Sequence, residues 1–196
     1  MEEIKPRYEF RVWADTLASL HEELGRLAES KVAESTETYL ISKATDKCNA
    51  KIRAALMDIK VLVEENRGLE QWRPILKHGF PLETAVIAAQ VFPSLGLPPP
   101  ALPKPAYELD EFLDAMARTD ARIAVVGVIK KRYRFNIGVC AAEYAQTLLN
   151  NVPRDTVAIE SVDSDAVLRL VARLGISDPN TSYIREIKHV LGWLPR

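Results

Sequence analysis

Charged and apolar side chains alternate one by one in several separate segments of this chain, and this pattern constrains the fold more than any other feature. Near the start, Arg7, Glu9 and Arg11 share one parity, while Tyr8 and Phe10 share the other. Successive side chains of a β-strand point to opposite faces, so such a segment forms a strand with one charged and one apolar face. The pattern predicts a chain built mainly on half-buried strands.

The same arrangement recurs further along the chain. The charged positions two residues apart are Lys51 and Arg53, Asp58 and Lys60, and Lys130, Arg132 and Arg134. The apolar faces of these strands must pack against helices. The charged faces would be wet in an open sheet, but they would line the interior of a closed one. An interior rich in Lys and Arg with a few Glu would suit a polyanion, with the Glu available to bind a metal ion.

The predicted elements follow from periodicity and from turn and cap residues. Strands are expected at 7–13, 36–43, 48–56, 58–64, about 69–77, 122–137, 138–149 and 155–163. This gives seven or eight antiparallel strands with helices inserted between them. Because no βαβ alternation occurs, a Rossmann fold is disfavoured.

Helix signals occur at the expected boundaries. Asp15 is predicted to cap a first helix, and Pro81 to begin another. A further helix follows at 107–119. Of the two helices near the end of the chain, one stops at Gly175, and the other starts with Asn180 or Thr181 as its cap.

Six prolines lie between residues 93 and 105. They predict a stiff, extended connector within a single domain spanning residues 1–196. The P-x-x-P spacing would also suit a ligand of an SH3-type domain, but a spacer is the favoured interpretation.

Composition excludes several classes of protein. A chain of 196 residues, 47% of them hydrophobic, can bury one real core or two small ones. A net charge of -1 argues against nucleic acid as a partner. Cys48 and Cys140 form neither a disulfide framework nor a zinc pattern. With no signal peptide and no apolar run near the roughly 20 residues of a membrane helix, we expect a cytoplasmic protein that does not bind membranes.

The order of these motifs resembles that of the CYTH family of triphosphate tunnel metalloenzymes, over nearly the whole chain. The family's first strand carries E-x-E-x-K, which corresponds to residues 7–11. A strand with a Tyr, a basic R-x-R strand and a strand ending in Lys follow. Their counterparts here are Tyr39, Lys51, Arg53 and Lys60.

The later motifs follow in the same order. The family's K-x-R corresponds to Lys130 and Arg132, its acidic residue on the next strand to Glu143, and its late E-x-E to 158–160. The Ser-Tyr near the end of many members corresponds to "TSY" at 181–183.

The resemblance implies an α+β fold: a closed or nearly closed eight-stranded antiparallel β-barrel, or tunnel, with helices packed outside. It also implies that basic side chains bind a small-molecule triphosphate or polyphosphate and that glutamates bind Mg²⁺ or Mn²⁺. The phosphate-binding candidates are Arg11, Lys51, Arg53, Lys60, Lys130 and Arg132. The metal-binding candidates are Glu9, Glu143 and Glu160.

Three residues depart from the family pattern, and two of these departures, Arg7 and Ala158, affect the metal site, whereas Arg11 keeps the charge of the lysine with a different geometry. Arg7 stands in place of the first glutamate, Ala158 in place of another, and Arg11 in place of the lysine. Fewer carboxylates weaken a site for a hard cation, and Arg7 would repel one. The three remaining glutamates have a second interpretation, as ion-pair partners of the neighbouring cations.

Several functions therefore stay open. They are metal-dependent hydrolysis of a triphosphate with water as the nucleophile, binding of a polyphosphate or nucleotide without catalysis, and a class IV-type adenylate cyclase. An open sheet that binds RNA is a further alternative. The sequence predicts neither a catalytic residue nor an oligomeric state.

Overall fold

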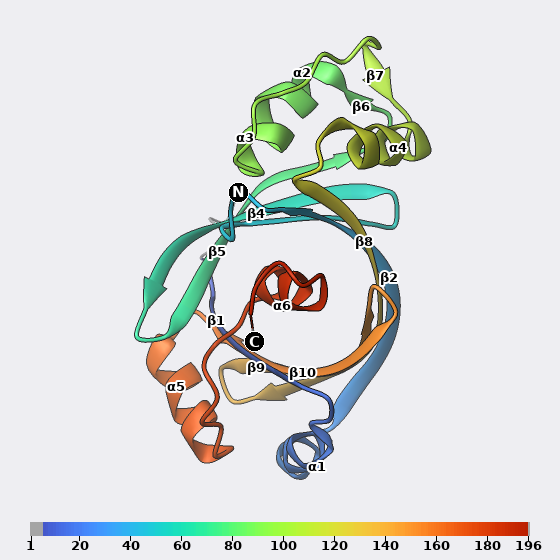
Figure 1. Ribbon diagram of the computed structural model, residues 1–196. Coiled ribbons are helices and arrows are strands. Elements are labelled where there is room, and N and C mark those ends of the chain that lie inside the picture. Colours follow the sequence, from blue (N-terminus) through green and yellow to red (C-terminus); the bar gives the residue numbers. More distant parts are fainter. Residues whose placement is uncertain (1–5, 196) are drawn as a thin grey trace. The chain divides into compact units, whose positions relative to one another are not determined.

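The computed structural model describes residues 6–195, and eight of its strands form a closed barrel in the order β1-β10-β9-β8-β2-β3-β4-β5 (Figure 1). These are β1 (Tyr8–Ala14), β2 (Ser30–Ser42), β3 (Cys48–Arg53), β4 (Leu56–Asn66), β5 (Leu69–Gly79), β8 (Ile123–Ile137), β9 (Cys140–Leu149) and β10 (Val152–Ser161). A separate hairpin pairs β6 (Leu82–Glu83) with β7 (Ala106–Tyr107). The α+β class and the closed eight-stranded antiparallel barrel are confirmed.

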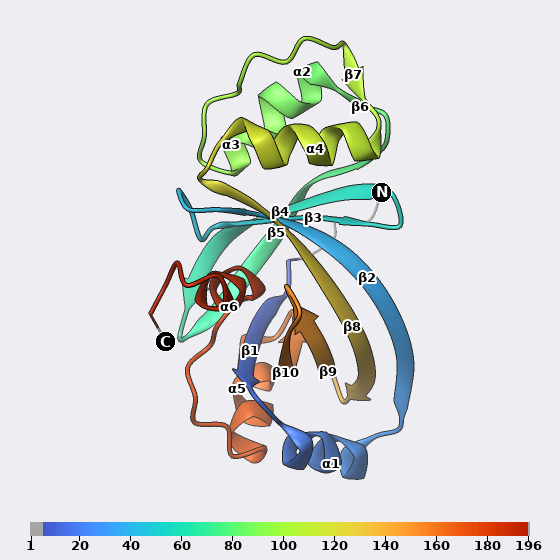
Figure 2. The same cartoon turned by 45° about the vertical axis from the view of Figure 1, so that its right-hand side comes forward.

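The helices lie between these strands and after them. They are α1 (Ala18–Leu27), α2 (Thr84–Val86), the π-helical turn η1 (Ile87–Val91), α3 (Phe92–Ser94), α4 (Leu109–Thr119), α5 (Ser164–Arg173) and α6 (Tyr183–Val190). The segments α2, η1 and α3 are consecutive and make one helical run (Figure 2). None of the helices within residues 6–195 is both long and apolar enough to span a lipid bilayer.

The chain divides into two compact units. Unit 1 contains the residues up to Ser35, Leu62–Arg73 and Ile129–Ser182, and unit 2 contains Thr36–Val61, Pro74–Val128 and the residues from Tyr183 onward. Four strands, β2, β4, β5 and β8, contribute residues to both units. Each unit has its own apolar core.

The core of unit 1 shows which face of its strands points inward. Phe10 and Val12 of β1 pack in one cluster with Leu24 of α1 and with Val167 and Leu170 of α5. Both helices lie outside the strands (Figure 1). The other parity of β1 therefore faces the barrel interior, and it is the parity that carries the charges.

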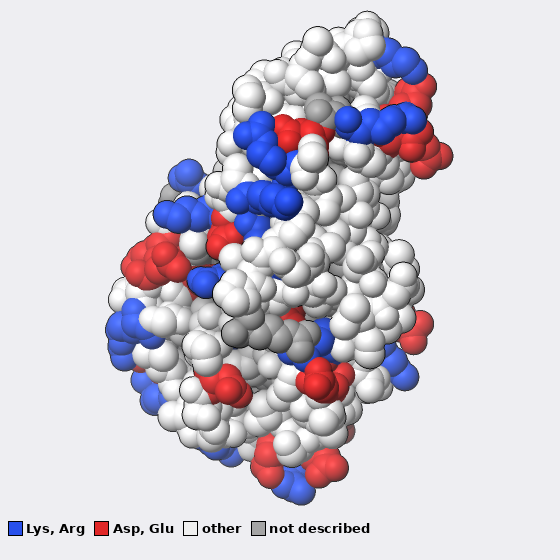
Figure 3. All heavy atoms as spheres, in the orientation of Figure 1, with Lys and Arg blue, Asp and Glu red and all other residues white. Residues whose placement is uncertain are grey.

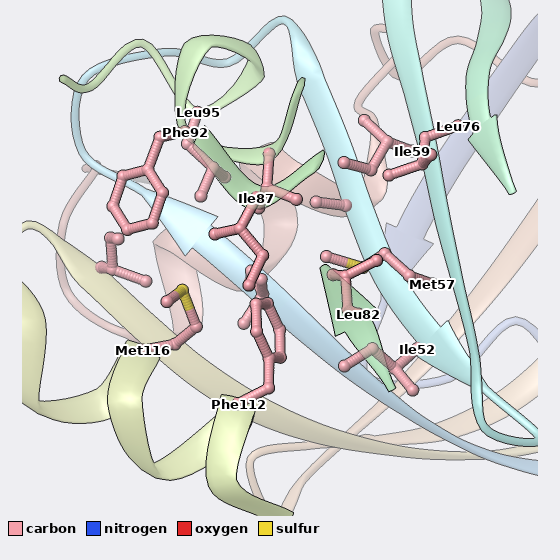
Figure 4. Packing of buried hydrophobic residues seen from close by; sticks show 14 of the residues in the cluster. Ile52, Met57, Ile59, Leu76, Leu82, Ile87, Phe92, Leu95, Phe112 and Met116 are labelled. Carbon is pink, nitrogen blue, oxygen red and sulfur yellow. The ribbon is translucent and has the colours of Figure 1, made fainter. Parts of the chain in front are cut away.

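The core of unit 2 obeys the same rule. Ile52 and Met57 from the apolar parity of β3 and β4 pack against the helical run and α4. Figure 4 shows Ile87, Phe112 and Met116 gathered against one another in this cluster. The charged parity of β3 and β4 thus points away from these helices.

The proline-rich segment forms no helix or strand between residues 95 and 105, whereas its first two residues, Pro93 and Ser94, belong to α3. Its leucines are nevertheless packed, since Leu95 and Leu97 are buried in the core of unit 2. The segment therefore contributes to the core rather than only spanning a distance.

The turn between β3 and β4 differs from the prediction. The strand predicted at 48–56 ends at Arg53, and β3 turns into β4 through Ala54 and Ala55, whose φ angles are 49° and 56°. Two-residue hairpin turns with positive φ favour Gly, Asn or Asp, so two alanines give no signal. The hairpin between β9 and β10 uses Asn150 and Asn151, which adopt this conformation more readily.

The capping prediction for the first helix is also wrong. Asp15 does not cap α1 but pairs with Arg154. The Leu17 N–H at this helix end instead donates to Asp155 Oδ2 at 3.0 Å. By contrast, Asp163 caps α5 by accepting from the N–H groups of the two residues that follow Ser164.

The unit 2 core provides the first test. Phe112 is fully buried, so Phe112→Ala should lower the free energy of unfolding by about 3–5 kcal/mol through lost burial and a residual cavity. Val139→Ala is the control, because Val139 is exposed and should change stability by no more than about 0.5 kcal/mol. Urea unfolding measures both, and equal effects would contradict the packing described here.

Candidate functional site

Arg11 is a buried cation of unit 1 with several hydrogen bonds. Its side chain is buried, with 7% of the residue exposed, and Nε donates to Glu9 Oε1 at 2.9 Å. Nη1 donates to Thr156 Oγ1 at 3.2 Å. Its backbone is held as well, since its N–H donates to Asn180 Oδ1 and its carbonyl accepts from the Thr181 N–H, both at 2.8 Å. These contacts fix the guanidinium before any ligand arrives.

The last of these contacts corrects a prediction. Asn180 and Thr181 were expected to cap the final helix, but they bind the edge of β1 beside Arg11. The "TSY" segment that resembles the family motif thus supports the charged face of β1.

The strand register brings three carboxylates side by side. Glu9 of β1 lies directly opposite Glu160 of β10 and directly opposite Glu70 of β5. Opposed residues of an antiparallel pair have Cβ atoms about 4.5–5.5 Å apart, and like charges there repel each other. Only the pairing of β1 with β5 shows that Glu70 lies next to Glu9.

The other two predicted metal ligands also contact arginines. Glu160 Oε1 accepts from Arg7 Nη1 at 2.8 Å. Glu143 Oε2 lies 3.9 Å from Arg132 Nη1. Together with the Glu9–Arg11 pair, every carboxylate predicted to bind metal therefore has an arginine beside it, as the second interpretation of the sequence expected.

The donor set was tested against the divalent ion that the resemblance implies. Within residues 6–195, no group of three or more His, Cys, Asp or Glu side chains is arranged so that it could hold a metal ion. Oxygens of Glu9 and Glu160 already accept from guanidinium groups. In this arrangement, Glu9, Glu143 and Glu160 form ion pairs and do not fit a coordination sphere.

These side chains surround a cavity in unit 1. Its volume is about 280 Å³, and its charged lining is Arg7, Arg11, Arg134, Glu9, Glu143 and Glu160. Ala158 also lines it, directly opposite both Arg11 and Glu143. A methyl group at this point leaves space where the family has a carboxylate.

Arg132 is incompletely satisfied. Its side chain is 14% exposed, and its buried Nε makes no hydrogen bond to any residue that the structure describes. Its 3.9 Å contact with Glu143 is too long for a hydrogen bond. A buried donor without an acceptor costs about 1–3 kcal/mol. Two residues earlier on the same face, Lys130 is buried too.

A second charged cluster lies in unit 2 around Glu37. This residue is 1% exposed, and its Oε2 accepts from Tyr39 Oη at 3.0 Å and from Lys51 Nζ at 3.3 Å. Arg53 Nη1 lies 3.6 Å from its other oxygen. Sequence analysis missed Glu37. Its signal was its position two residues before Tyr39, which places both on one strand face.

Burial affects the charge of Lys51. It lowers the pKa of the Lys51 ammonium group, an effect that the nearby Glu37 carboxylate opposes and Arg53 reinforces. Lys51 lies opposite Asp58, and Lys60 lies opposite Asn49. The Oδ1 atom of Asn49 is buried and accepts no hydrogen bond from the described residues.

Helix α6 packs on the strand face that carries Glu37 and Lys51, whereas the helices around the core of unit 2 pack on the apolar face. Tyr183 at its start stacks on Tyr39, with 5.7 Å between ring centroids and 21° between ring planes. The helix thus covers part of the face that carries Glu37 and Lys51.

The six predicted phosphate-binding residues therefore fall into two groups. Unit 1 holds Arg11, Lys130 and Arg132, and unit 2 holds Lys51, Arg53 and Lys60. All six lie on barrel strands and on the charged parity. On the face of the molecule shown in Figure 3, both basic and acidic residues occur.

The surroundings of the two cysteines disfavour the thiolate form. Burial raises the pKa of the Cys48 thiol to about 12, and it also raises the pKa of Cys140. Both thiols are buried and protonated near neutral pH.

Comparison with known proteins supports the fold. No protein-family model matches the sequence, and a search of curated proteins found no match. A conserved hypothetical protein of Pyrococcus furiosus matches with a TM-score of 0.53 and 13% identity, over 91% of this chain and 97% of that chain. The PH1012 protein of Pyrococcus horikoshii matches with a TM-score of 0.51 and 14% identity, over 92% and 98%.

A more distant match is the Pct1 RNA triphosphatase of S. pombe, with a TM-score of 0.33 and 9% identity, over 96% of this chain and 80% of that chain. That similarity supports no inference about activity. The tunnel fold implied by the resemblance to the CYTH family is confirmed by the strand order of the closed barrel.

The Glu37 cluster gives a stability prediction. Glu37→Gln should lower the free energy of unfolding by about 1–3 kcal/mol, because a buried acceptor of two hydrogen bonds loses its charge. The control is Arg53→Gln, whose side chain is 44% exposed and should cost no more than about 1 kcal/mol. If urea unfolding shows the larger loss for the control, Glu37 is not the centre of this cluster.

Proposed function

We propose that the protein binds a triphosphate-bearing polyanion, inorganic or organic, through the cations on the charged faces of its barrel strands. The observation that carries this proposal is Arg132, a largely buried guanidinium whose Nε has no acceptor among the described residues. An unpaired buried donor is costly, and a phosphate oxygen is the kind of acceptor that would satisfy it.

The neighbouring cations support the same ligand. A triphosphate carries about four negative charges near neutral pH, and it needs several Lys and Arg to replace its hydration. Arg11 and Lys130 are buried, and Arg11 is held by Glu9, Thr156 and its own backbone contacts. Ordering such side chains in advance reduces the entropy lost on binding. That all six predicted cations bind phosphate remains a prediction.

Hydrolysis is the second candidate, because the resemblance implies it. A divalent ion such as Mg²⁺ or Mn²⁺, when bound, would polarise a phosphoryl oxygen and activate water. Glu9, Glu143 and Glu160 would be its ligands, but each lies beside an arginine in this structure. We therefore place binding first. Release of phosphate from tripolyphosphate, thiamine triphosphate or ATP with Mg²⁺ or Mn²⁺ would show hydrolysis, and release of pyrophosphate from ATP would point to a cyclase.

Titration calorimetry with tripolyphosphate tests the binding proposal. Arg132→Gln should weaken binding about tenfold or more, which corresponds to about 1.4 kcal/mol. Arg132→Lys should recover only part of the loss, since lysine keeps the charge but lacks the guanidinium geometry. Arg118→Gln, which changes an exposed side chain of α4, is the matched control and should bind like the unaltered protein. Absence of binding by the unaltered protein would refute the proposal.

Lys51 makes binding depend on pH. Its lowered pKa means that its positive charge is lost earlier than that of an ordinary lysine as pH rises, so affinity should fall toward alkaline pH. In Lys51→Arg the charge persists, and the decline should shift to higher pH. Calorimetry at increasing pH compares the affinity of the unaltered protein with that of Lys51→Arg. Because the ligand titrates identically in both experiments, any difference between the two pH profiles comes from residue 51. Superimposable pH profiles would exclude Lys51 from the binding site.

The same lowered pKa has a consequence for stability. At Lys51 the folded state binds fewer protons than the unfolded chain does. The contribution of Lys51 to the free energy of unfolding therefore increases as pH rises from its lowered pKa toward the ordinary pKa of lysine.

A further inference from the structure

The carboxylates around the unit 1 cavity are already neutralised by the chain itself. Three arginines, Arg7, Arg11 and Arg134, line it together with three glutamates. A site built for a divalent ion normally keeps an excess of carboxylate charge, because that charge sets its affinity for the metal. Here the excess is absent from the lining of the cavity.

The contacts also occupy one oxygen of each of two carboxylates that a metal would use. Glu9 Oε1 accepts from Arg11 at 2.9 Å, and Glu160 Oε1 accepts from Arg7 at 2.8 Å. A magnesium ion binds oxygen at about 2.0–2.1 Å, so it would lie next to a guanidinium on each side. Both guanidinium groups would then have to move away or remain close to the cation and repel it.

Two of the three departures from the family pattern change the charge of this cavity. Arg7 adds a cation at one end of the β1 face, and Ala158 removes an anion opposite Arg11. Both changes move the charge of the cavity in the positive direction. Each one favours an anion over a cation as the occupant.

We propose that this cavity binds its polyanion without a divalent metal, with the guanidinium groups of Arg7 and Arg11 neutralising the phosphates in place of the ion. This inference rests on the proposed function and narrows it to the metal-free form of the ligand. Arginine has five N–H donors, more than one carboxylate can use, so each guanidinium can contact a glutamate and a phosphate together.

The glutamates then act as positioning residues. Glu9 binds the Arg11 guanidinium from the same strand, and Glu160 binds the Arg7 guanidinium from the neighbouring strand β10. The Arg7 side chain is 56% exposed, so it can turn toward an incoming ligand without breaking a packed core. Arg11, by contrast, is already in place.

The experiment is titration calorimetry with tripolyphosphate, in buffer containing EDTA and again with excess Mg²⁺. The unaltered protein should bind in EDTA, and excess Mg²⁺ should weaken binding because it neutralises the ligand. Arg7→Gln should reduce the affinity in EDTA about tenfold, as expected for a lost charge-assisted contact, while Arg118→Gln should not change it.

A double variant reverses the two departures. Arg7→Glu combined with Ala158→Glu should lose binding in EDTA and bind only when Mg²⁺ is present. Electron paramagnetic resonance of Mn²⁺ gives an independent readout without phosphate: the double variant should bind the ion, and the unaltered protein should not. Circular dichroism checks that both proteins are folded, and Arg7→Gln alone carries the test if the double variant is not.

The outcomes separate this inference from the proposed function. Binding by the unaltered protein only in Mg²⁺ or Mn²⁺ would overturn the metal-free inference and leave the proposed function standing. Binding of Mn²⁺ by the ligand-free unaltered protein would overturn it as well. Absence of tripolyphosphate binding under both conditions would refute the proposed function itself.

Discussion

Closure of the sheet is the constraint on which the rest of this structure depends, because it turns one face of every barrel strand away from bulk water. A charged residue on such a face must find a partner, since an unpaired buried charge is very costly. The contacts of Arg11 with Glu9, and of Lys51 with Glu37, meet this requirement within each unit. Arg132, whose Nε has no acceptor among the described residues, is where the proposed polyanion would meet this requirement.

The same closure explains why the charged and apolar parities have such different surroundings. Phe10 and Val12 pack against α1 and α5, while Arg11 between them contacts Glu9, Thr156 and the ring of Trp13. Because neighbouring residues of a strand cannot share a face, the packing of the helices determines where the charges point. The apolar cores of the two units thus orient the side chains proposed to bind phosphate.

Much of the architecture could be predicted from local patterns. The strands and the end of α5 at Gly175 follow from period-two alternation and from a residue that adopts positive φ easily. The Ala54–Ala55 turn could not be predicted, because its conformation is imposed by the pairing of β3 with β4. Asp15 looked like a helix cap, but Arg154, far away in sequence, attracts its carboxylate instead. Local signals fail where a distant partner supplies a stronger interaction.

The sequence by itself determined which residues share a strand face, and therefore that Arg7, Glu9 and Arg11 would act together. That follows from the two-residue repeat of the extended backbone and needs no tertiary information. Only the tertiary structure decided what that face meets. Strand register placed Glu160 and Glu70 opposite Glu9, and Ala158 opposite Arg11. Register depends on pairing between segments far apart in the chain, so the ion pairs that distinguish an anion site from a metal site appear only once the barrel is closed.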